Sequence, residues 1–295
     1  MNFQWYPGHM TKAKRQMQED MKLIDLVIEL LDARVPLSSR NPDIDQIAGS
    51  KARLVLLNKA DMADPLVTEQ WNRFFLEQGL NVCVINSKNP SDVKKINAEV
   101  QKACAAKIER DRRRGIKNRP VRAMVVGIPN VGKSTFINTY ARKAATKTGN
   151  KPGVTKGKQW IRLGTNLELL DTPGILWPKF EDQEVGLKLA LIGSIKDEIM
   201  NTEELSLELI KMLNRRYPDL ISNYYGLSGI DYDKYPGKPE VAEMEAVGTA
   251  RGALMKGGEI DYLKTANILL ENFRNAKLGR LSLEEPEQVS ETEKS

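Results

Sequence analysis

Short apolar segments alternate with amphipathic stretches along residues 1–178. Branched apolar side chains dominate the short segments, which is typical of buried β-strands. The predicted strands are Leu23–Leu31, Arg53–Leu57, Val82–Ile85, Arg122–Val126, Trp160–Leu163 and Leu167–Leu170. Between them we predict helices, one opening at Asp64-Pro65 and ending at Gly79, another from about Asp92 to Arg113. This alternation predicts an α/β fold, with a six-stranded, mostly parallel sheet covered by helices on both faces.

Beyond this region the apolar residues recur at helical spacing instead. Leu205, Leu209 and Leu213 would share one face of a helix, and residues 241–255 and 262–273 show the same periodicity. No strand pattern interrupts these segments, so the later part of the chain is predicted to be helical.

Three regions follow from these patterns. We predict an α/β domain over residues 1–178 and an all-α domain over residues 179–282. Residues 283–295 are polar, aperiodic and rich in glutamate, and we predict that they form a disordered acidic tail.

Composition narrows the class of protein. The chain is 41% hydrophobic and 28% charged, which is ordinary for a globular protein. No apolar run approaches the ~18 residues that a membrane-spanning helix needs, so no membrane partner is expected. Two cysteines and one histidine exclude a disulfide framework and a Cys/His zinc site. We therefore expect a cytoplasmic protein.

Positive charge is concentrated rather than spread. The net charge is +6, and residues 107–122 hold eight basic side chains against two acidic ones. This run is either a solvated helix end with a linker or a contact for a phosphate backbone.

Residues 127–134 carry a phosphate-binding motif. Their sequence, Gly-Ile-Pro-Asn-Val-Gly-Lys-Ser, is a complete P-loop between a predicted strand and a predicted helix. Such a loop turns backbone N–H groups toward phosphate oxygens, and the helix N-terminus adds a favourable dipole. Lys133 would reach the β- and γ-phosphates, and Ser134 would be a ligand of Mg²⁺.

A second motif selects the base. Residues 58–61 are Asn-Lys-Ala-Asp, directly after a predicted strand. The Asp61 carboxylate can accept two hydrogen bonds from the ring N–H and amino group of guanine, which adenine cannot supply. Asn58 would brace this pocket, the stem of Lys59 would cover the base, and Asn86-Ser87-Lys88 would close its other edge.

A third motif is expected to sense the γ-phosphate. Asp171-Thr172-Pro173-Gly174 follows the last predicted strand, so Asp171 would hold Mg²⁺ through water and the N–H of Gly174 would touch the γ-phosphate. Thr155 is the best candidate for a second Mg²⁺ hydroxyl, and the alternative is a plain loop threonine.

The order of these motifs is unusual. GTPases ordinarily begin with the P-loop and carry the base-specificity motif later, whereas here Asn58–Asp61 and Ser87 precede Gly127–Ser134. Each motif still follows a strand, which is what a circular permutation of the same sheet produces.

With these motifs the chain resembles the bacterial ribosome biogenesis GTPase A family of circularly permuted GTPases. The resemblance covers residues ~3–283 and includes further segments that match the family. They are Trp5-Tyr6-Pro7-Gly8-His9-Met10, Lys12-Ala13, Asp32-Ala33-Arg34-Val35-Pro36, Asn272-Phe273-Arg274 and Lys277-Leu278-Gly279-Arg280.

The resemblance implies a function. It implies a GTPase that hydrolyses GTP to GDP and phosphate during a late step of large ribosomal subunit maturation, stimulated by that subunit. GTP would favour binding to the ribosome and its RNA, which the helical domain is expected to contact, and GDP would favour release. The alternatives are a GTPase in another RNA-linked or signalling role, without ribosome stimulation, and an RNA-binding module that binds nucleotide without turnover. No DNA partner is expected, and a monomer is the simplest arrangement.

Hydrolysis poses a separate question. Many GTPases position the attacking water with a glutamine after Asp-x-x-Gly, but this chain has Ile175 there. His9 is either a surface or capping residue or, as the resemblance implies, the catalytic group that orients water. Asn130 matches the position that binds K⁺ in some GTPases. Arg34 is an alternative cation, although a salt bridge with Asp32 is the simpler expectation.

The predicted site therefore contains the catalytic His9, the Mg²⁺ ligands Ser134, Thr155 and Asp171, and a candidate K⁺ ligand, Asn130. The predicted GTP- and GDP-binding residues are Asn58, Lys59, Ala60, Asp61, Asn86, Ser87, Lys88, Gly127, Asn130, Val131, Gly132, Lys133, Ser134, Thr135, Thr155 and Gly174.

Overall fold

A computed structural model gives the fold of the chain. It describes residues 9–116, 119–148, 160–163, 166–171, 182–195 and 201–286. The chain forms two compact units, Met1–Gln183 with Glu284–Ser295, and Glu184–Leu283. The first is called the α/β unit below and the second the helical unit.

The α/β unit contains one six-stranded sheet with the strand order β3-β2-β1-β4-β6-β5. All neighbouring strands are parallel except β5 and β6, which are antiparallel. The six-stranded, mostly parallel sheet expected from the apolar pattern is therefore confirmed. Its strands are β1 (Leu26–Asp32), β2 (Ala52–Asn58), β3 (Asn81–Val84), β4 (Val121–Val126), β5 (Trp160–Leu163) and β6 (Leu167–Asp171).

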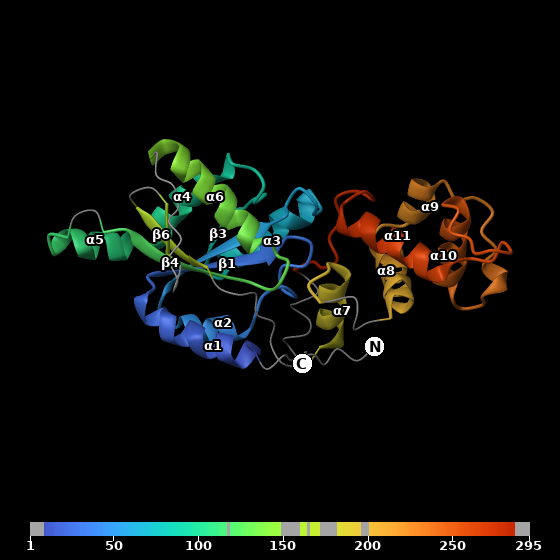
Figure 1. The fold of residues 1–295 in the computed structure, drawn as a ribbon, viewed down its shortest axis with the longest axis horizontal. Coiled ribbons are helices and arrows are strands. Elements are labelled where there is room, and N and C mark those ends of the chain that lie inside the picture. Colours follow the sequence, from blue (N-terminus) through green and yellow to red (C-terminus); the bar gives the residue numbers. More distant parts are fainter. Residues whose placement is uncertain are drawn as a thin grey trace. The chain divides into compact units, whose positions relative to one another are not determined.

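Helices cover both faces of this sheet (Figure 1), with α1 and α2 on one face and α4 and α6 on the other. Both faces are therefore shielded from water, and every residue of β1 is buried. The bounds of the helices in this unit are α1 (His9–Asp20), α2 (Asp43–Ala48), α3 (Pro65–Glu77), α4 (Asp92–Ala103), α5 (Ala105–Arg113) and α6 (Lys133–Thr148).

Helix α3 shows how local sequence and packing agree. The carboxylate of Asp64 accepts hydrogen bonds from the N–H groups of Leu66 and Val67, and Pro65 occupies the first turn. Trp71 and Phe75 project from α3 into a core beneath β1 and β2 and are fully buried. The predicted start at Asp64-Pro65 is confirmed.

The long helix expected from Asp92 to Arg113 is divided into two. α4 ends at Ala103 and α5 begins at Ala105, with Cys104 between them in a non-helical conformation (φ −103°, ψ 11°). The Cys104 side chain is buried at this break. Helical spacing continues across a single such residue, so the apolar pattern could not reveal the division.

The helical unit is built from helices around its own core. Leu205, Leu209 and Leu213 of α8 are buried, as their spacing predicted, and α8 packs against α10 and α11. The helices of this unit are α7 (Gln183–Leu191), α8 (Thr202–Arg216), α9 (Leu220–Tyr225), α10 (Pro239–Ala250) and α11 (Tyr262–Arg274). No helix in the described ranges is both long and apolar enough to cross a membrane.

Two residues near the end of α11 have structural contacts. Asn272 donates a hydrogen bond to the Tyr225 hydroxyl (2.9 Å), and Arg274 donates to the carbonyls of Ala190 and Leu191 at the end of α7. These bonds hold the end of α11 against the last turn of α7.

The first residues of the predicted acidic tail are part of the fold. Residues 283–286 are ordered, and the Glu284 carboxylate is buried, where it accepts hydrogen bonds from Leu37 N–H and from the N–H (3.0 Å) and hydroxyl of Ser38. The glutamate-rich composition suggested that Glu284 is solvated, because composition does not show that Leu37 and Ser38 offer it hydrogen-bond donors. Residues 287–295 lie outside the described part.

Candidate nucleotide-binding site

The predicted motifs meet at one edge of the sheet. β2 ends at Asn58, β4 leads into Gly127, and β6 ends at Asp171. Because these strands are parallel, their carboxyl ends share an edge. Strands are added outward from β1 to β3, and β4 then lies on the other side of β1. Such a reversal creates a ligand-binding crevice at the carboxyl edge of an open α/β sheet.

The P-loop adopts a conformation that depends on two glycines. Gly127 has φ +154° and Gly132 has φ +103°, so both lie where side chains are disfavoured. A Cβ atom would lie 2.7 Å from the Leu30 carbonyl oxygen at Gly127, and 2.5 Å from Asn58 Nδ2 at Gly132. The loop therefore passes too close to its neighbours to accept larger residues.

The first turn of α6 presents the phosphate-binding groups. α6 begins at Lys133, whose ammonium donates to the carbonyls of Gly127 (3.0 Å) and Ile128 (2.9 Å). These bonds hold the cation inside the loop, where its charge adds to the helix dipole. Ser134 and Thr135 are exposed beside it.

Asn58 joins three parts of the site. Its side chain is fully buried, donates to the Val131 carbonyl (2.7 Å) and accepts from Ser87 N–H (2.9 Å). β2, the loop after β3 and the P-loop are therefore fixed to one amide. This arrangement is the one that the predicted bracing role of Asn58 requires.

Lys59 is held by a buried carboxylate. Its ammonium is 2.8 Å from Asp32 Oδ2, and Arg34 binds the same carboxylate through two nitrogens (2.9 and 2.8 Å). The expected Asp32–Arg34 salt bridge is therefore confirmed. Burial by itself would raise the pKa of Asp32, but Arg34 and Lys59 together outweigh burial and hold that pKa well below its usual value. Asp32 is therefore an anion that fixes the direction of the lysine stem.

The remaining base-pocket residues follow β2 and β3. Asp61 is exposed, and its carboxylate makes no hydrogen bond or ion pair with the described residues. Asn86 N–H donates to Asp92 Oδ2 (3.0 Å), and Lys88 N–H donates to Asn86 Oδ1 (2.9 Å). These bonds set the course of the loop that carries Ser87.

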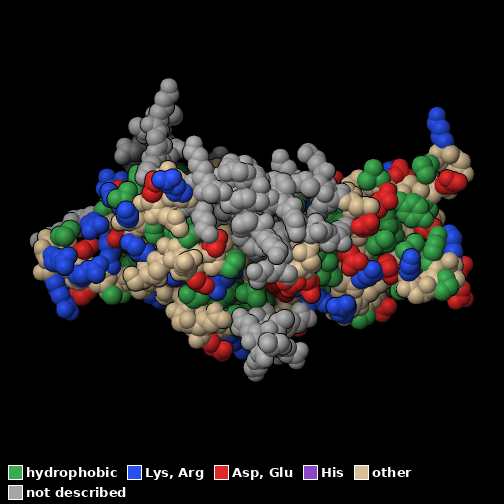
Figure 2. Space-filling model, turned by 90° about the horizontal axis from the view of Figure 1, so that it is seen from below, with side chains coloured by type: hydrophobic (Ala, Val, Ile, Leu, Met, Phe, Trp, Pro, Cys, Tyr) green, Lys and Arg blue, Asp and Glu red, His purple; other side chains and the backbone are tan. Residues whose placement is uncertain are grey.

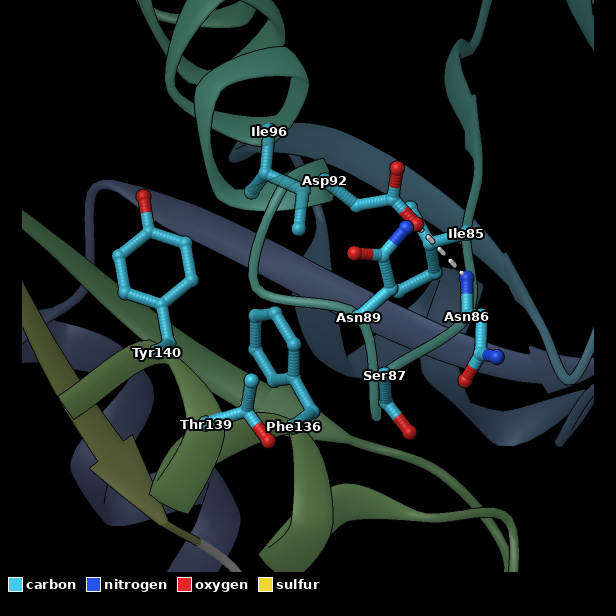
Figure 3. A pocket seen from close by; sticks show the side chains of 9 residues that line it. All are labelled: Ile85, Asn86, Ser87, Asn89, Asp92, Ile96, Phe136, Thr139 and Tyr140. Carbon is cyan, nitrogen blue, oxygen red and sulfur yellow. Dashed lines mark hydrogen bonds between the residues drawn. The ribbon is translucent and has the colours of Figure 1, made fainter. Parts of the chain in front are cut away.

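A small hollow lies beside this loop (Figure 3). Phe136, Thr139 and Tyr140 of α6 face the loop and helix α4 across it. Its volume is about 10 Å³, about one water molecule, so it does not hold a base. It marks the packing between α6 and the base-pocket loop.

Some residues of the predicted site lie outside the part of the chain that the structure describes. Thr155 and Gly174 lie outside the described residues, as does the segment before His9. Only the backbone is described at His9, the first residue of α1, and at Asp171, the last residue of β6. Among the described residues, no cluster of three or more His, Cys, Asp and Glu side chains could hold a metal.

Comparisons with known proteins agree with the motifs. A protein-family model described as "50S ribosome-binding GTPase" matches residues 122–220. The "Ribosome biogenesis GTPase A" of Bacillus cereus is 49% identical over 292 residues, covering 99% of this chain and 96% of that protein. The chain belongs to the ribosome biogenesis GTPase A family.

Solved structures extend the likeness to the fold. GDP-bound TM YlqF has a TM-score of 0.65 and 27% identity, covering 92% of this chain and all of that one. GNP-bound YlqF from Thermotoga maritima has a TM-score of 0.63 and 29% identity, covering 94% of this chain and 99% of that one. The fold is therefore that of a circularly permuted GTPase.

Sequence reasoning missed one part of the site. Asp32 was expected to pair with Arg34 alone, yet it also binds Lys59. Asp32 and Asn58 are register partners at the ends of β1 and β2, so Lys59 follows directly beside Asp32. The sequence signal for the Asp32–Lys59 pair is an acidic residue that ends one strand and a lysine that directly follows the neighbouring strand.

We predict that Gly132→Ala weakens GDP binding by about tenfold or more. The new methyl group would meet the amide of Asn58, which two hydrogen bonds hold in place, and φ +103° adds strain of about 1–3 kcal/mol. Calorimetric titration with GDP and Mg²⁺ measures the change.

The matched control is Gly49→Ala. Gly49 also has positive φ (+54°), but no atom lies within 4 Å of its Cβ position. This variant should lose stability and keep its GDP affinity. Equal GDP affinity in Gly132→Ala and the wild type would contradict the close packing of Asn58 against the loop.

Proposed function

We propose that this protein hydrolyses GTP and acts in a late step of large ribosomal subunit assembly. It binds the subunit and its RNA more strongly with GTP than with GDP. The observation that carries the proposal is the convergence of the P-loop and Asn58–Asp61 at one sheet edge, in a chain of this family. The name "50S ribosome-binding GTPase" of the matching family supports the choice of subunit.

The P-loop binds the phosphates. Backbone N–H groups at the start of α6 and the Lys133 ammonium meet the β- and γ-phosphate oxygens. Ser134, exposed in the first turn, and Asp171, at the end of the strand paired with β4, would hold Mg²⁺ together with Thr155. These are the oxygen donors that Mg²⁺ prefers, and the ion would neutralise charge on the phosphates.

Asp61 selects guanine. Its exposed carboxylate is available to accept the ring N–H and amino hydrogens of the base. Lys59 lies beside it, and the ion pair with Asp32 holds the aliphatic stem of Lys59 where it can cover one face of the base. Asn58 and Ser87 fix the position of the pocket relative to the phosphates.

Hydrolysis depends on His9 and on the bound particle. Ile175 cannot orient water, so His9 supplies this function by hydrogen bonding. Asn130, which has φ +59° near the apex of the loop, would hold a K⁺ ion, and the ion would supply positive charge to the transition state. The subunit raises the rate by ordering these groups.

Chain connections support a switch. The segment after Asp171 leads into the helical unit, and the chain returns to the α/β unit at Glu284. Glu284 is bonded to Leu37 and Ser38, in the loop after Asp32. When the γ-phosphate is lost, a movement at either end of the helical unit would therefore be transmitted to a segment of the nucleotide site.

Large ribosomal subunits should raise the GTP turnover of the protein by about tenfold or more. Subunits should also retain more protein in cosedimentation with a non-hydrolysable GTP analogue than with GDP. His9→Ala should lower the stimulated rate by about 10²-fold and leave retention unchanged, because it removes water orientation alone. Gln18→Ala, at an exposed position of the same helix α1, is the control.

Two outcomes would count against this proposal. Neither binding nor stimulation by subunits would remove the ribosomal role and favour a GTPase with another RNA-linked or signalling role. Nucleotide binding with no turnover under any condition would remove the enzymatic role.

Asp61→Asn should exchange guanine for xanthine nucleotides. GDP affinity should fall by about 10- to 100-fold, since a hydrogen bond to a charged group contributes about 1.5–3 kcal/mol. Xanthosine diphosphate should bind more tightly than GDP, because an amide N–H can donate to its 2-oxo group. Asp64→Asn, which changes the cap of α3, should leave the preference unchanged. Retained GDP preference in Asp61→Asn would place base selection elsewhere.

Turnover without ribosomes should be about tenfold faster in KCl than in NaCl at equal ionic strength. Asn130→Ala should remove that difference, because it removes the side-chain oxygen proposed to hold K⁺. Equal rates in the two salts for the wild type would exclude the K⁺ role.

A further inference from the structure

Helix α5 lies at the opposite end of the sheet from the nucleotide site. Lys107 of α5 is 3.3 Å from Asp25, and Asp25 also accepts a hydrogen bond from Arg122 N–H (3.0 Å). Asp25 immediately precedes β1, and Arg122 lies at the start of β4. The base of α5 is therefore anchored at the amino ends of β1 and β4, and the P-loop follows the carboxyl end of β4.

The exposed part of α5 carries uncompensated positive charge. Its two acidic residues are both paired within the helix, Glu109 with Arg113 (3.0 Å) and Asp111 with Lys107 (3.2 Å). Arg112 and Arg114 are exposed and make no side-chain hydrogen bond or ion pair with the described part of the chain. Figure 2 shows Lys and Arg side chains gathered where α5 lies in Figure 1. A helix C-terminus favours some positive charge, but three consecutive arginines that continue past its end exceed that need.

A hollow of about 330 Å³ adjoins this surface. Lys107, Arg112 and Arg119 line it, with Asp111 as its acidic residue. Ile108 and Val121 form part of its wall. Its size is at the lower end of the ~300–1,000 Å³ range of small-ligand sites, so it has room for one unit of a larger chain.

The surroundings indicate what this surface contacts. Aromatic residues are absent from the sequence between Glu77 and Thr135, so this segment offers no aromatic side chain on which an unpaired base can stack. Recognition of single-stranded RNA relies on such stacking, whereas double-helical RNA is bound largely through its backbone. Arginine is well suited to phosphate because its guanidinium group can donate two parallel hydrogen bonds.

We propose that Arg112, Arg113 and Arg114, with the adjoining hollow, bind the phosphate backbone of double-helical RNA. The choice of RNA as the partner rests on the proposed function. The positive charge of the surface is observed independently of that function. This contact belongs to the α/β unit and lies apart from the nucleotide-binding edge. It holds RNA without taking part in GTP hydrolysis.

A matched pair of variants tests the proposal. Arg113 and Arg73 are similarly exposed (78% and 72%), and each pairs with a glutamate one turn earlier on its helix. Arg113→Gln and Arg73→Gln therefore remove the same charge from similar settings. The triple variant Arg112→Gln/Arg113→Gln/Arg114→Gln completes the set, and all variants are compared with the wild type.

The full-length proteins are titrated with a 20-base-pair RNA duplex, the same duplex in DNA and a 20-nucleotide poly(U) strand, at several salt concentrations. Arg113→Gln should lower the salt slope of duplex RNA binding by about 1, and the triple variant by about 2–3 with at least tenfold weaker binding. Arg73→Gln should change neither. Turnover without ribosomes should be unchanged in every variant.

Several results would overturn the proposal. An unchanged salt slope in the triple variant would do so, as would an equal loss in Arg73→Gln. Tighter binding of poly(U) than of the RNA duplex, or of duplex DNA than of duplex RNA, would exclude double-helical RNA as the partner. Failure of the wild type to bind large subunits would remove the proposed function alone, because the loss on the RNA duplex would still identify the surface.

Discussion

The nucleotide-binding edge depends on the buried amide of Asn58. Its two hydrogen bonds join Val131 of the P-loop to Ser87, in segments far apart in the sequence. The amide is fully buried, so leaving the Val131 carbonyl or the Ser87 N–H without its hydrogen bond would cost about 1–3 kcal/mol of stability. Gly132 must remain a glycine because the loop packs directly against this side chain. Phosphate and base recognition are thereby held in one rigid frame.

A second buried group, the Asp32 carboxylate, joins the base motif to the following loop. Asp32 binds Lys59 of the base motif and Arg34 of the following loop, and that loop also supplies the donors that bind Glu284. Lys59 and Glu284 are thus linked through one short, internally bonded segment. Because the chain enters the helical unit after Asp171, both of its connections reach motifs of the nucleotide site.

The parallel sheet separates two kinds of chemistry within one unit. Its carboxyl edge gathers the P-loop and the base motif, since every parallel strand delivers its following loop there. Its amino edge carries Asp25 and the base of α5. The pocket and the basic surface therefore lie at opposite ends of the same parallel strands.

The sequence by itself determined the number and order of the strands, the motif order and the family, because apolar periodicity and the P-loop depend on local spacing. The predicted start of the first strand was wrong, because Leu23 ends a 3-10 helix and β1 begins at Leu26. The sequence also predicted the α3 cap and the buried face of α8. Only the tertiary structure decided that α4 and α5 separate at Cys104, that Lys59 pairs with Asp32, and that Glu284 is buried. These features depend on partners distant in the sequence or on one backbone conformation. Composition and periodicity describe what each residue can do, and packing decides which donor or acceptor it meets.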